Sequence, residues 1–372
     1  MSDADVQARL RAYRDAVMRR EVSPDAWPRL QRRLRREPWR RAGLAAAAVA
    51  LVVAVAAAGP GLVASWTRRE PTTAGKPGQP TVATQIPLGC TLSSAARNLE
   101  VGFGAVWVAC QAALVRIDPA SNRIAAVIPL QWMDANAGIA FSDDWVWVTS
   151  GSSAHPVVYQ LDPAHNREIT QTPLPGGAHG IVIAEGTIWV TQQGSEPAKS
   201  GPGTVARLDA DTGRRLRPIE LPSPPIAIRS GLGAIWVTTY SMRDEFAAYR
   251  IDPRTGTVTR VPRVQIVVAA GPNSLWVTTD KPRAGVHRVD PATGRVLATV
   301  PVERVGRVAF GFGALWASTD TKLYRLDPNS AQPVGAPVAL QDASTALAVG
   351  EGSIWVGEQG RESAIVRLNL TR

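Results

Sequence analysis

Short segments in which hydrophobic and polar residues alternate follow one another from about residue 81 to the end of the chain. A Gly-rich turn joins these segments in pairs, and the second member of each pair is rich in β-branched residues and carries a tryptophan. This pattern predicts two antiparallel strands in each unit. The tryptophans recur every 39 to 47 residues, at Trp107, Trp147, Trp189, Trp236, Trp276, Trp316 and Trp355.

A third segment ends in Asp in six of the seven units, usually followed by Pro, as in RIDP at 116–119 and RLDP at 325–328, whereas the seventh reads RLNL at 367–370. The Asp side chain accepts hydrogen bonds from backbone amides two residues on, and Pro presets the φ angle of a type I turn. A residue type that tolerates the left-handed conformation follows four residues later in five units, whereas Ala331 breaks the pattern in the sixth. The five residues are Asn122, Asn166, Gly213, Gly256 and Gly294.

A fourth strand then leads into the next unit, so each unit of about 40 residues predicts one four-stranded propeller blade. Seven units predict an all-β, seven-bladed β-propeller over 81–372. The last unit stops after its third strand, while the segment 81–89 precedes the first unit and resembles a fourth strand. We therefore expect this N-terminal strand to complete the last blade and close the ring.

The region before the propeller predicts a membrane anchor. Residues 44–66 carry no charge over 23 positions, which is long enough to cross a bilayer as a helix, and we assign 42–66 to one transmembrane helix. Residues 1–41 hold 12 Arg against 6 acidic residues, so the positive-inside rule predicts a cytoplasmic N-terminus. We assign residues 67–80 to a linker and expect the propeller to lie outside a bacterial cell membrane. A cleaved secretory signal is the alternative.

The net charge of +10 comes mostly from the tail and the linker, which leaves about +2 on the propeller. The propeller has no basic stripe in its sequence, so we expect no nucleic acid as a partner. The tail has helical spacing of apolar residues over 3–20, and Ser23 and Pro24 predict the start of a second short helix. A transmembrane signalling role, in which this helical tail docks a cytoplasmic partner, is therefore an alternative function.

The chain has two cysteines, Cys90 and Cys110. In propeller geometry the crossover that holds Cys90 and the loop that follows the strand of Trp107 share one face. Because an extracytoplasmic compartment is oxidising, we expect a disulfide between the two cysteines rather than metal binding.

Units such as GAIWVTT at 233–239, followed by RIDPRTG at 250–256, resemble the bacterial propellers of the streptogramin (virginiamycin B) lyase-like and YncE-like groups. This resemblance implies a seven-bladed propeller and, for the lyases, a carbon–oxygen bond cleavage by His and Glu side chains with Mg. The lyase pattern places a His ten residues before a tryptophan and a Glu three residues after it. Here His179 and Glu358 match these places, but they belong to different blades, and Gln192 stands where His179 would need a Glu.

The distance from tryptophan to Asp is larger in blades two, three and four than in blades one and six. The additions fall at 150–155, 192–203 and 239–246, in the same connection of consecutive blades, and insertions grouped in this way build binding surfaces. We expect a binding face that includes Gln192, Gln193, Tyr240, Met242, Arg243 and Phe246.

The function that we expect is therefore a sensor or scaffold module without catalysis, cofactor or metal. Its partners are a protein, peptide or glycan of the cell envelope, together with the lipid bilayer. A lyase that uses His179 and Glu358 with Mg is the enzymatic alternative.

Overall fold

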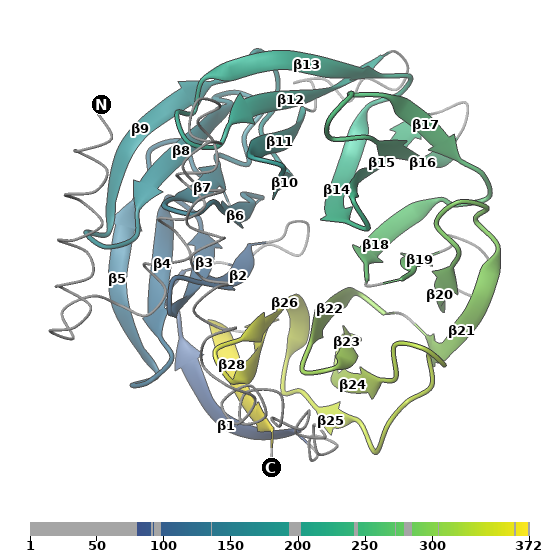
Figure 1. Ribbon diagram of the computed structural model, residues 1–372. Coiled ribbons are helices and arrows are strands. Elements are labelled where there is room, and N and C mark those ends of the chain that lie inside the picture. The colour runs from purple at the N-terminus through teal and green to yellow at the C-terminus, as the bar shows by residue number, and fades with distance from the viewer. Residues whose placement is uncertain are drawn as a thin grey trace, which may run out of the picture. The chain divides into compact units, whose positions relative to one another are not determined.

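The computed structural model describes residues 80–90, 92, 98–134, 136–192, 202–241, 245–271, 273–278, 285–303, 305–360 and 362–370. They form seven four-stranded antiparallel sheets arranged as blades around a central axis, as Figure 1 shows. The predicted seven-bladed propeller is thus confirmed. The predicted tail at 1–41, the transmembrane helix at 42–66 and nearly all of the linker lie outside the described residues. Within the described part, no helix is long and apolar enough to cross a membrane.

In six of the seven blades the chain runs from the innermost strand to the outermost strand, and the seventh takes its outermost strand from the start of the propeller (Figure 1). Blade one holds β2 (Leu99–Gly102), β3 (Ala105–Cys110), β4 (Ala113–Asp118) and β5 (Arg123–Pro129). Blade two holds β6 (Ile139–Phe141), β7 (Val146–Thr149), β8 (Val157–Asp162) and β9 (Arg167–Pro173). Blade three holds β10 (Ile181–Ala184), β11 (Thr187–Gln192), β12 (Gly203–Asp209) and β13 (Arg215–Leu221). Blade four holds β14 (Pro225–Gly231), β15 (Ala234–Ser241), β16 (Glu245–Ile251) and β17 (Val258–Val261).

The remaining three blades follow the same order. Blade five holds β18 (Ile266–Ala270), β19 (Leu275–Thr278), β20 (Gly285–Val289) and β21 (Val296–Glu303). Blade six holds β22 (Arg307–Gly311), β23 (Ala314–Ser318), β24 (Lys322–Leu326) and β25 (Val338–Ala339). Blade seven holds β26 (Ala343–Gly350), β27 (Ser353–Gln359), β28 (Ser363–Leu370) and, as its outer strand, β1 (Pro80–Pro87).

The outer strand of blade seven confirms the predicted closure of the ring. Strand β1 pairs antiparallel with β28, from Pro80 opposite Leu370 to Pro87 opposite Ala364. The strand begins one residue before the predicted boundary of the propeller, because Pro80, which the sequence assigned to the linker, takes part in this pairing.

The seven repeated tryptophans are buried, each at most 1% exposed, and they fill the space between blades. Trp107 of blade one packs with Ile139 and Val148 of blade two. Trp355 of blade seven packs with Val106 and Val108 of blade one, so the same contact also closes the ring. Replacing a buried tryptophan by alanine costs about 3–5 kcal/mol.

The arginine of the repeated third-strand motif joins blade seven to blade one, blade one to blade two and blade five to blade six. The guanidinium of Arg367 stacks over Trp355 at 5.1 Å from the ring centroid and donates to the Pro119 carbonyl and to Asn122 Oδ1 in the Asp turn of blade one. Arg116 makes the same contacts from blade one to the turn of blade two, which includes Asn166. The turn of one blade is therefore a hydrogen-bond acceptor for its neighbour.

The Asp turns form as predicted. Asp118 accepts hydrogen bonds from the Ser121 hydroxyl and the Ala120 amide, and these bonds lower the pKa of its carboxyl. Ala331 adopts the left-handed conformation, with φ of 62°, and its amide donates to the Asp327 carbonyl at 2.8 Å. The residue type at this position breaks the sequence pattern, but the turn keeps its geometry.

Candidate functional site

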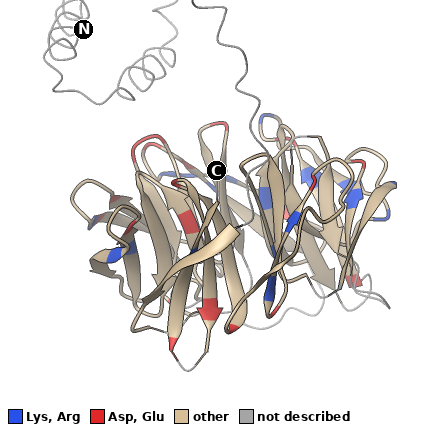
Figure 2. Ribbon diagram, turned by 90° about the horizontal axis from the view of Figure 1, so that it is seen from below, with Lys and Arg blue, Asp and Glu red and all other residues tan. Residues whose placement is uncertain are grey.

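One face of the propeller gathers most of its irregular segments. Because neighbouring strands in a blade are antiparallel, the crossover into a blade and the connection between its second and third strands lie at the same end of the sheet. We call this end of the ring the crossover face. Seen from the side in Figure 2, the blades stand around the axis, with acidic and basic residues interspersed on them.

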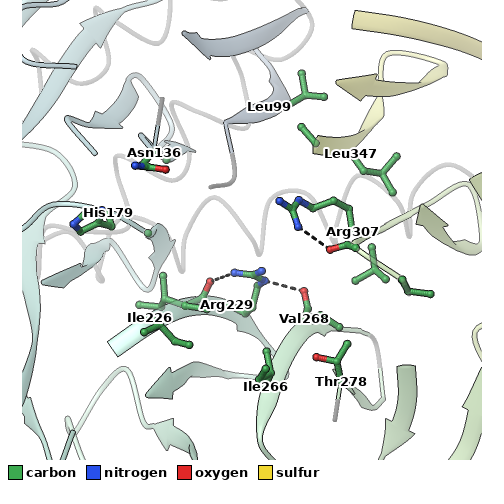
Figure 3. A pocket seen from close by; sticks show the side chains of 18 residues that line it. Leu99, Asn136, His179, Ile226, Arg229, Ile266, Val268, Thr278, Arg307 and Leu347 are labelled. Atoms are coloured by element: carbon green, nitrogen blue, oxygen red, sulfur yellow. Dashed lines mark hydrogen bonds between the residues drawn. The ribbon is translucent and has the colours of Figure 1, made fainter. Parts of the chain in front are cut away.

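A cavity of about 450 Å³ lies on the central axis, at the end of the inner strands that is next to the crossover face. Its lining comes from the residues just before or at the start of inner strands, such as His179, Ile226 and Arg307. Apolar side chains, including Leu99, Ile266 and Leu347, form much of the wall, as Figure 3 shows. A cavity of this size accommodates a small organic molecule.

Arg229 lies in β14 and reaches into this cavity. Its Nε donates to the carbonyl of Val268 at 2.8 Å, and its Nη1 donates to the carbonyl of Ile228 at 2.7 Å. The strand register of β18 shifts between Val267 and Ala269, so Val268 occupies a bulge there. A bulged residue is left out of the regular pairing of the strand, which explains why its carbonyl accepts from a side chain.

Arg307, in β22, repeats this arrangement two blades later. Its Nε donates to the Thr345 carbonyl at 2.8 Å, and its Nη1 donates to the Gly306 carbonyl at 2.8 Å. Thr345 also lies at a register shift, between Ser344 and Ala346 of β26. Burial lowers the pKa of the Arg307 guanidinium from its usual value. An arginine nevertheless stays charged at neutral pH.

His179 also lines the cavity, in the crossover that leads to β10. Its Nε2 lies 3.2 Å from Ser153 Oγ, in the connection between β7 and β8. Burial lowers the pKa of the imidazole, and the neighbouring charge of Asp134 opposes this effect. Burial raises the pKa of Asp134, whose Oδ1 accepts from the Asn136 amide at 2.7 Å. His179 is therefore favoured as the neutral imidazole.

Glu358, the other predicted acid–base residue, is in a different environment. It is 1% exposed and is not among the described residues that line the cavity. Its Oε1 accepts from the Gln341 amide at 3.2 Å, in the crossover that leads into its own blade. Burial raises the pKa of this carboxyl, and the charge of Asp342 adds to the effect. Oε2 is buried and has no hydrogen-bond partner within the described part of the chain.

The position three residues after the tryptophan has a shared structural role. Glu358 occupies it in blade seven, and Gln192 occupies it in blade three, where Nε2 donates to the Gly176 carbonyl at 3.4 Å. In blade one it is Cys110, which forms a disulfide with Cys90 across 5.9 Å between Cα atoms. In all three blades this side chain binds the preceding crossover to the second strand, and we call the three contacts crossover latches.

Three residues of the predicted binding face, Gln192, Tyr240 and Phe246, lie within the described residues. Tyr240 is 40% exposed, and its ring lies 5.1 Å from that of Phe246, the residue opposite it in the β15–β16 hairpin. Gln192 is mostly buried as a crossover latch, and it also lines a second cavity of about 500 Å³. Gln193, Met242 and Arg243 lie outside the described residues.

The described residues of the addition at 239–246 in blade four are paired as strands. Strand pairing continues through Thr239, Tyr240 and Ser241, which lie opposite Ala247, Phe246 and Glu245. The added residues therefore extend a regular hairpin, because β-branched and aromatic residues pair well across strands.

A second exposed aromatic pair has no counterpart in the predicted binding face. Trp132, in the crossover into blade two, is 45% exposed and stacks on His155 at 3.9 Å between ring centroids. The backbone of Trp132 has φ of 70°, a conformation that large side chains rarely adopt. Trp132 is not one of the seven repeated tryptophans. A tryptophan in a crossover between blades, outside the repeat, was the feature of the sequence that could have indicated this pair.

The described residues contain no group of three or more His, Cys, Asp and Glu side chains arranged to hold a metal ion. The arrangement at the axis is instead a partly apolar cavity with two fixed guanidinium groups. Such a cavity has the chemistry to bind a ligand.

No protein-family model matches the chain, and no curated protein matches its sequence. Solved structures do match its fold. Hydrazine synthase of Kuenenia stuttgartiensis superposes with a TM-score of 0.58 at 9% identity, over 74% of this chain and 97% of that chain. The Pan2 WD40 domain of Neurospora crassa gives a TM-score of 0.58 at 11% identity, over 80% of this chain and 100% of that chain.

The computationally designed Ika8 protein gives a TM-score of 0.54 at 12% identity, over 76% of this chain and 98% of that chain. At these identities the similarity establishes the propeller fold alone, because one fold carries many unrelated activities.

Proposed function

We propose that this protein is a binding module whose ligand docks on the crossover face of the propeller. The observation that carries the proposal is that the mouth of the central cavity and two exposed aromatic pairs share this face. The pairs are Trp132 with His155 and Tyr240 with Phe246. Exposed aromatic side chains are enriched in binding surfaces because they offer a large contact area with few rotatable bonds.

The cellular setting is part of the same proposal and rests on the sequence. The uncharged stretch within 42–66 and the Arg-rich segment before it support a single-pass anchor in a bacterial membrane, with the propeller outside. The disulfide between Cys90 and Cys110 is compatible with an oxidising compartment. Ligands in that setting are envelope proteins, peptides or glycans.

Site-specific photocrosslinking in the full-length protein tests the binding face. A photoreactive residue at Trp132 or Tyr240 is expected to give a discrete adduct in cells. The same residue at Val127 or Val296, which are exposed at 57% and 54% on outer strands, is the matched control and is expected to give none. Equal adducts from both sets of positions, or no adduct from the crossover face, would contradict the proposal.

Protease treatment of intact cells with a permeable outer layer tests the topology. The propeller is expected to be cleaved from outside while an epitope at the N-terminus stays protected. Protection of the propeller in cells whose membrane is intact would show that the proposed orientation is wrong.

A further inference from the structure

We propose that the crossover face also carries out a reaction, the hydrolysis of carboxylic esters that carry an aromatic group, with Ser153 as the nucleophile and His179 as the general base. This goes beyond the docking proposed above, because it assigns a chemical step to residues beside the central cavity. His179 Nε2 lies 3.2 Å from Ser153 Oγ, close enough for the imidazole to take the hydroxyl proton. Both residues are partly exposed, and His179 lies on the wall of the cavity, as Figure 3 shows.

Backbone hydrogen bonds fix the two segments that carry these side chains. The Gly151 amide donates to the Ala178 carbonyl at 2.8 Å, and the Ala178 amide donates to the Ser152 carbonyl at 3.3 Å. The connection between β7 and β8 is therefore joined to the crossover into blade three by its backbone alone. Packing of the two segments does not require the contact between Ser153 and His179, and this contact lies at the edge of a cavity that a small molecule fits.

The imidazole of His179 is in the form that a general base needs. Burial lowers its pKa, which favours the neutral ring, and the tautomer with its proton on Nδ1 leaves Nε2 as the acceptor for the Ser153 hydroxyl. The charge of Asp134 raises the same pKa and therefore stabilises the imidazolium that forms when Ser153 gives up its proton. The Asn136 amide donates to Asp134 Oδ1 at 2.7 Å and orients the carboxylate. Asp134 is thus a positioning residue that acts through His179.

The stacked aromatic pair beside this site supplies a surface for the aromatic group of the ester. His155 is two residues after Ser153, and its ring stacks on Trp132 at 3.9 Å with 14° between the ring planes. Trp132 is the third residue of a turn in which the Met133 amide donates to the Leu130 carbonyl, and its φ of 70° is the conformation that glycine or asparagine adopts in a type II turn. A large side chain that is kept at such a position points to a function for the exposed ring.

The reaction consists of two acyl transfers, with water as the co-reactant. Ser153 Oγ forms a bond to the carbonyl carbon of the ester while His179 Nε2 takes the hydroxyl proton. The bond from this carbon to the alcohol oxygen then breaks, and the alcohol leaves with that proton. Water adds to the carbon of the acyl-serine and gives its proton to Nε2, the bond to Oγ breaks, the acid is released, and the proton returns to Oγ. The Ser153 amide donates to no acceptor among the described residues and is a donor for the oxyanion that forms in each transfer.

Labelling of the purified full-length protein with a fluorophosphonate probe tests the nucleophile, because such a probe reacts with an activated serine. Mass spectrometry of wild type is expected to find the label on the peptide that holds Ser153. Ser153→Ala and His179→Gln are each expected to lose this label and to hydrolyse p-nitrophenyl acetate about 100-fold more slowly than wild type.

A second hydroxyl–imidazole pair in the ring is the matched control. His287 Nδ1 lies 3.0 Å from Thr299 Oγ1 in strands β20 and β21, and neither residue is among the described residues that line the central cavity. His287→Gln and Thr299→Ala are expected to take the label at Ser153 and to hydrolyse the ester like wild type. An esterase carried through purification is common to all the variants and cancels in the comparison.

Two more variants separate positioning from binding. Asp134→Asn removes the charge that raises the pKa of His179, so the rise of the rate with pH is expected to move to lower pH while the maximal rate falls. A purely structural role of Asp134 would leave the position of this rise unchanged. Trp132→Ala is expected to raise KM for p-nitrophenyl acetate several-fold, with most of the loss in kcat/KM carried by KM.

Thermal melting checks that each variant folds, and if Ser153→Ala does not fold, the identity of the labelled peptide in wild type still decides. A label that is absent from this peptide, or equal hydrolysis by His179→Gln and His287→Gln, would overturn the assignment. These outcomes are separable from that of the proposed function. A protein that is not labelled but keeps its crosslink at Tyr240 would refute the reaction and leave the binding face standing.

Discussion

Substitution of Glu358 by Gln is expected to stabilise the propeller at neutral pH. The carboxyl is buried, Oε1 accepts one backbone hydrogen bond from Gln341, and Oε2 has no partner within the described residues. Burial, together with the charge of Asp342, raises the pKa of Glu358 above its usual value of 4.5. Glutamine keeps the shape and the accepting oxygen of the side chain but carries no charge.

The sign and size of the effect follow from this environment. The folded state binds the proton of Glu358 more tightly than the unfolded state does, so this group's contribution to stability is fully present below pH 4.5. That contribution is lost as the pH rises through 4.5 and on through the higher pKa of the folded state. Glutamine still leaves a polar atom in the place of Oε2, so the gain comes from removing the buried charge, and we expect about 1–3 kcal/mol at pH 7. For a domain of this size the gain corresponds to roughly 2–6 °C in melting temperature.

Thermal and urea unfolding between pH 3.5 and pH 8 measures this effect. The advantage of Glu358→Gln over wild type is expected to grow with pH and to vanish near pH 3.5. Gln192→Glu is the matched reciprocal variant, because it sets a carboxylate against the Gly176 carbonyl at the equivalent position of blade three. It is expected to lose stability as the pH rises. A difference between Glu358→Gln and wild type that stays constant over this range would refute the argument.

Two further predictions concern the ring. Gly350→Ala is expected to cost more than 2 kcal/mol, because a Cβ there would lie 2.6 Å from Val101 Cγ1 of the next blade. Gly176→Ala, whose Cβ would meet Gln192 at an ordinary 3.5 Å, is the control for urea unfolding, and equal losses in the two variants would contradict the packing argument. Replacing Cys90 by Ser is expected to lower stability by about 3 kcal/mol, the value for a loop of about 20 residues. Reducing agent is expected to destabilise wild type by the same amount and to leave the stability of the variant unchanged. A melting temperature of wild type that does not change with reducing agent would count against the disulfide.

The repeat pattern was sufficient to predict the fold because each repeated residue type has a local physical role. The tryptophan at a fixed interval identifies the strand that packs on the next blade, and the Asp identifies the turn after the third strand. The contact made by the arginine of the same motif could not be predicted from the sequence, because its hydrogen-bond acceptor lies in the following blade. Arg116, for example, donates to Asn166, which is 50 residues away.

The candidate site was less accessible from the sequence for the same reason. Arg229 and Arg307 belong to strands that look ordinary, and their convergence depends on closure of the ring. Glu358 and Gln192 drew attention as polar residues beside a tryptophan strand, but the structure uses both as crossover latches. Spacing along the chain singled out the position three residues after the tryptophan. The role of the side chain at that position depends on its surroundings, which the sequence does not show.

The pairing of β1 with β28 has a consequence for synthesis of the chain. Pro80 lies opposite Leu370, so the first strand of the ring waits for a partner that the ribosome makes about 290 residues later. At 5–20 residues per second this interval is on the order of 15–60 s. During that time β1 lacks the other three strands of blade seven, and blade one lacks Trp355, the tryptophan that packs on Val106 and Val108. A chain that is released early cannot close the ring, so completion of the final strand acts as a checkpoint that separates finished molecules from fragments.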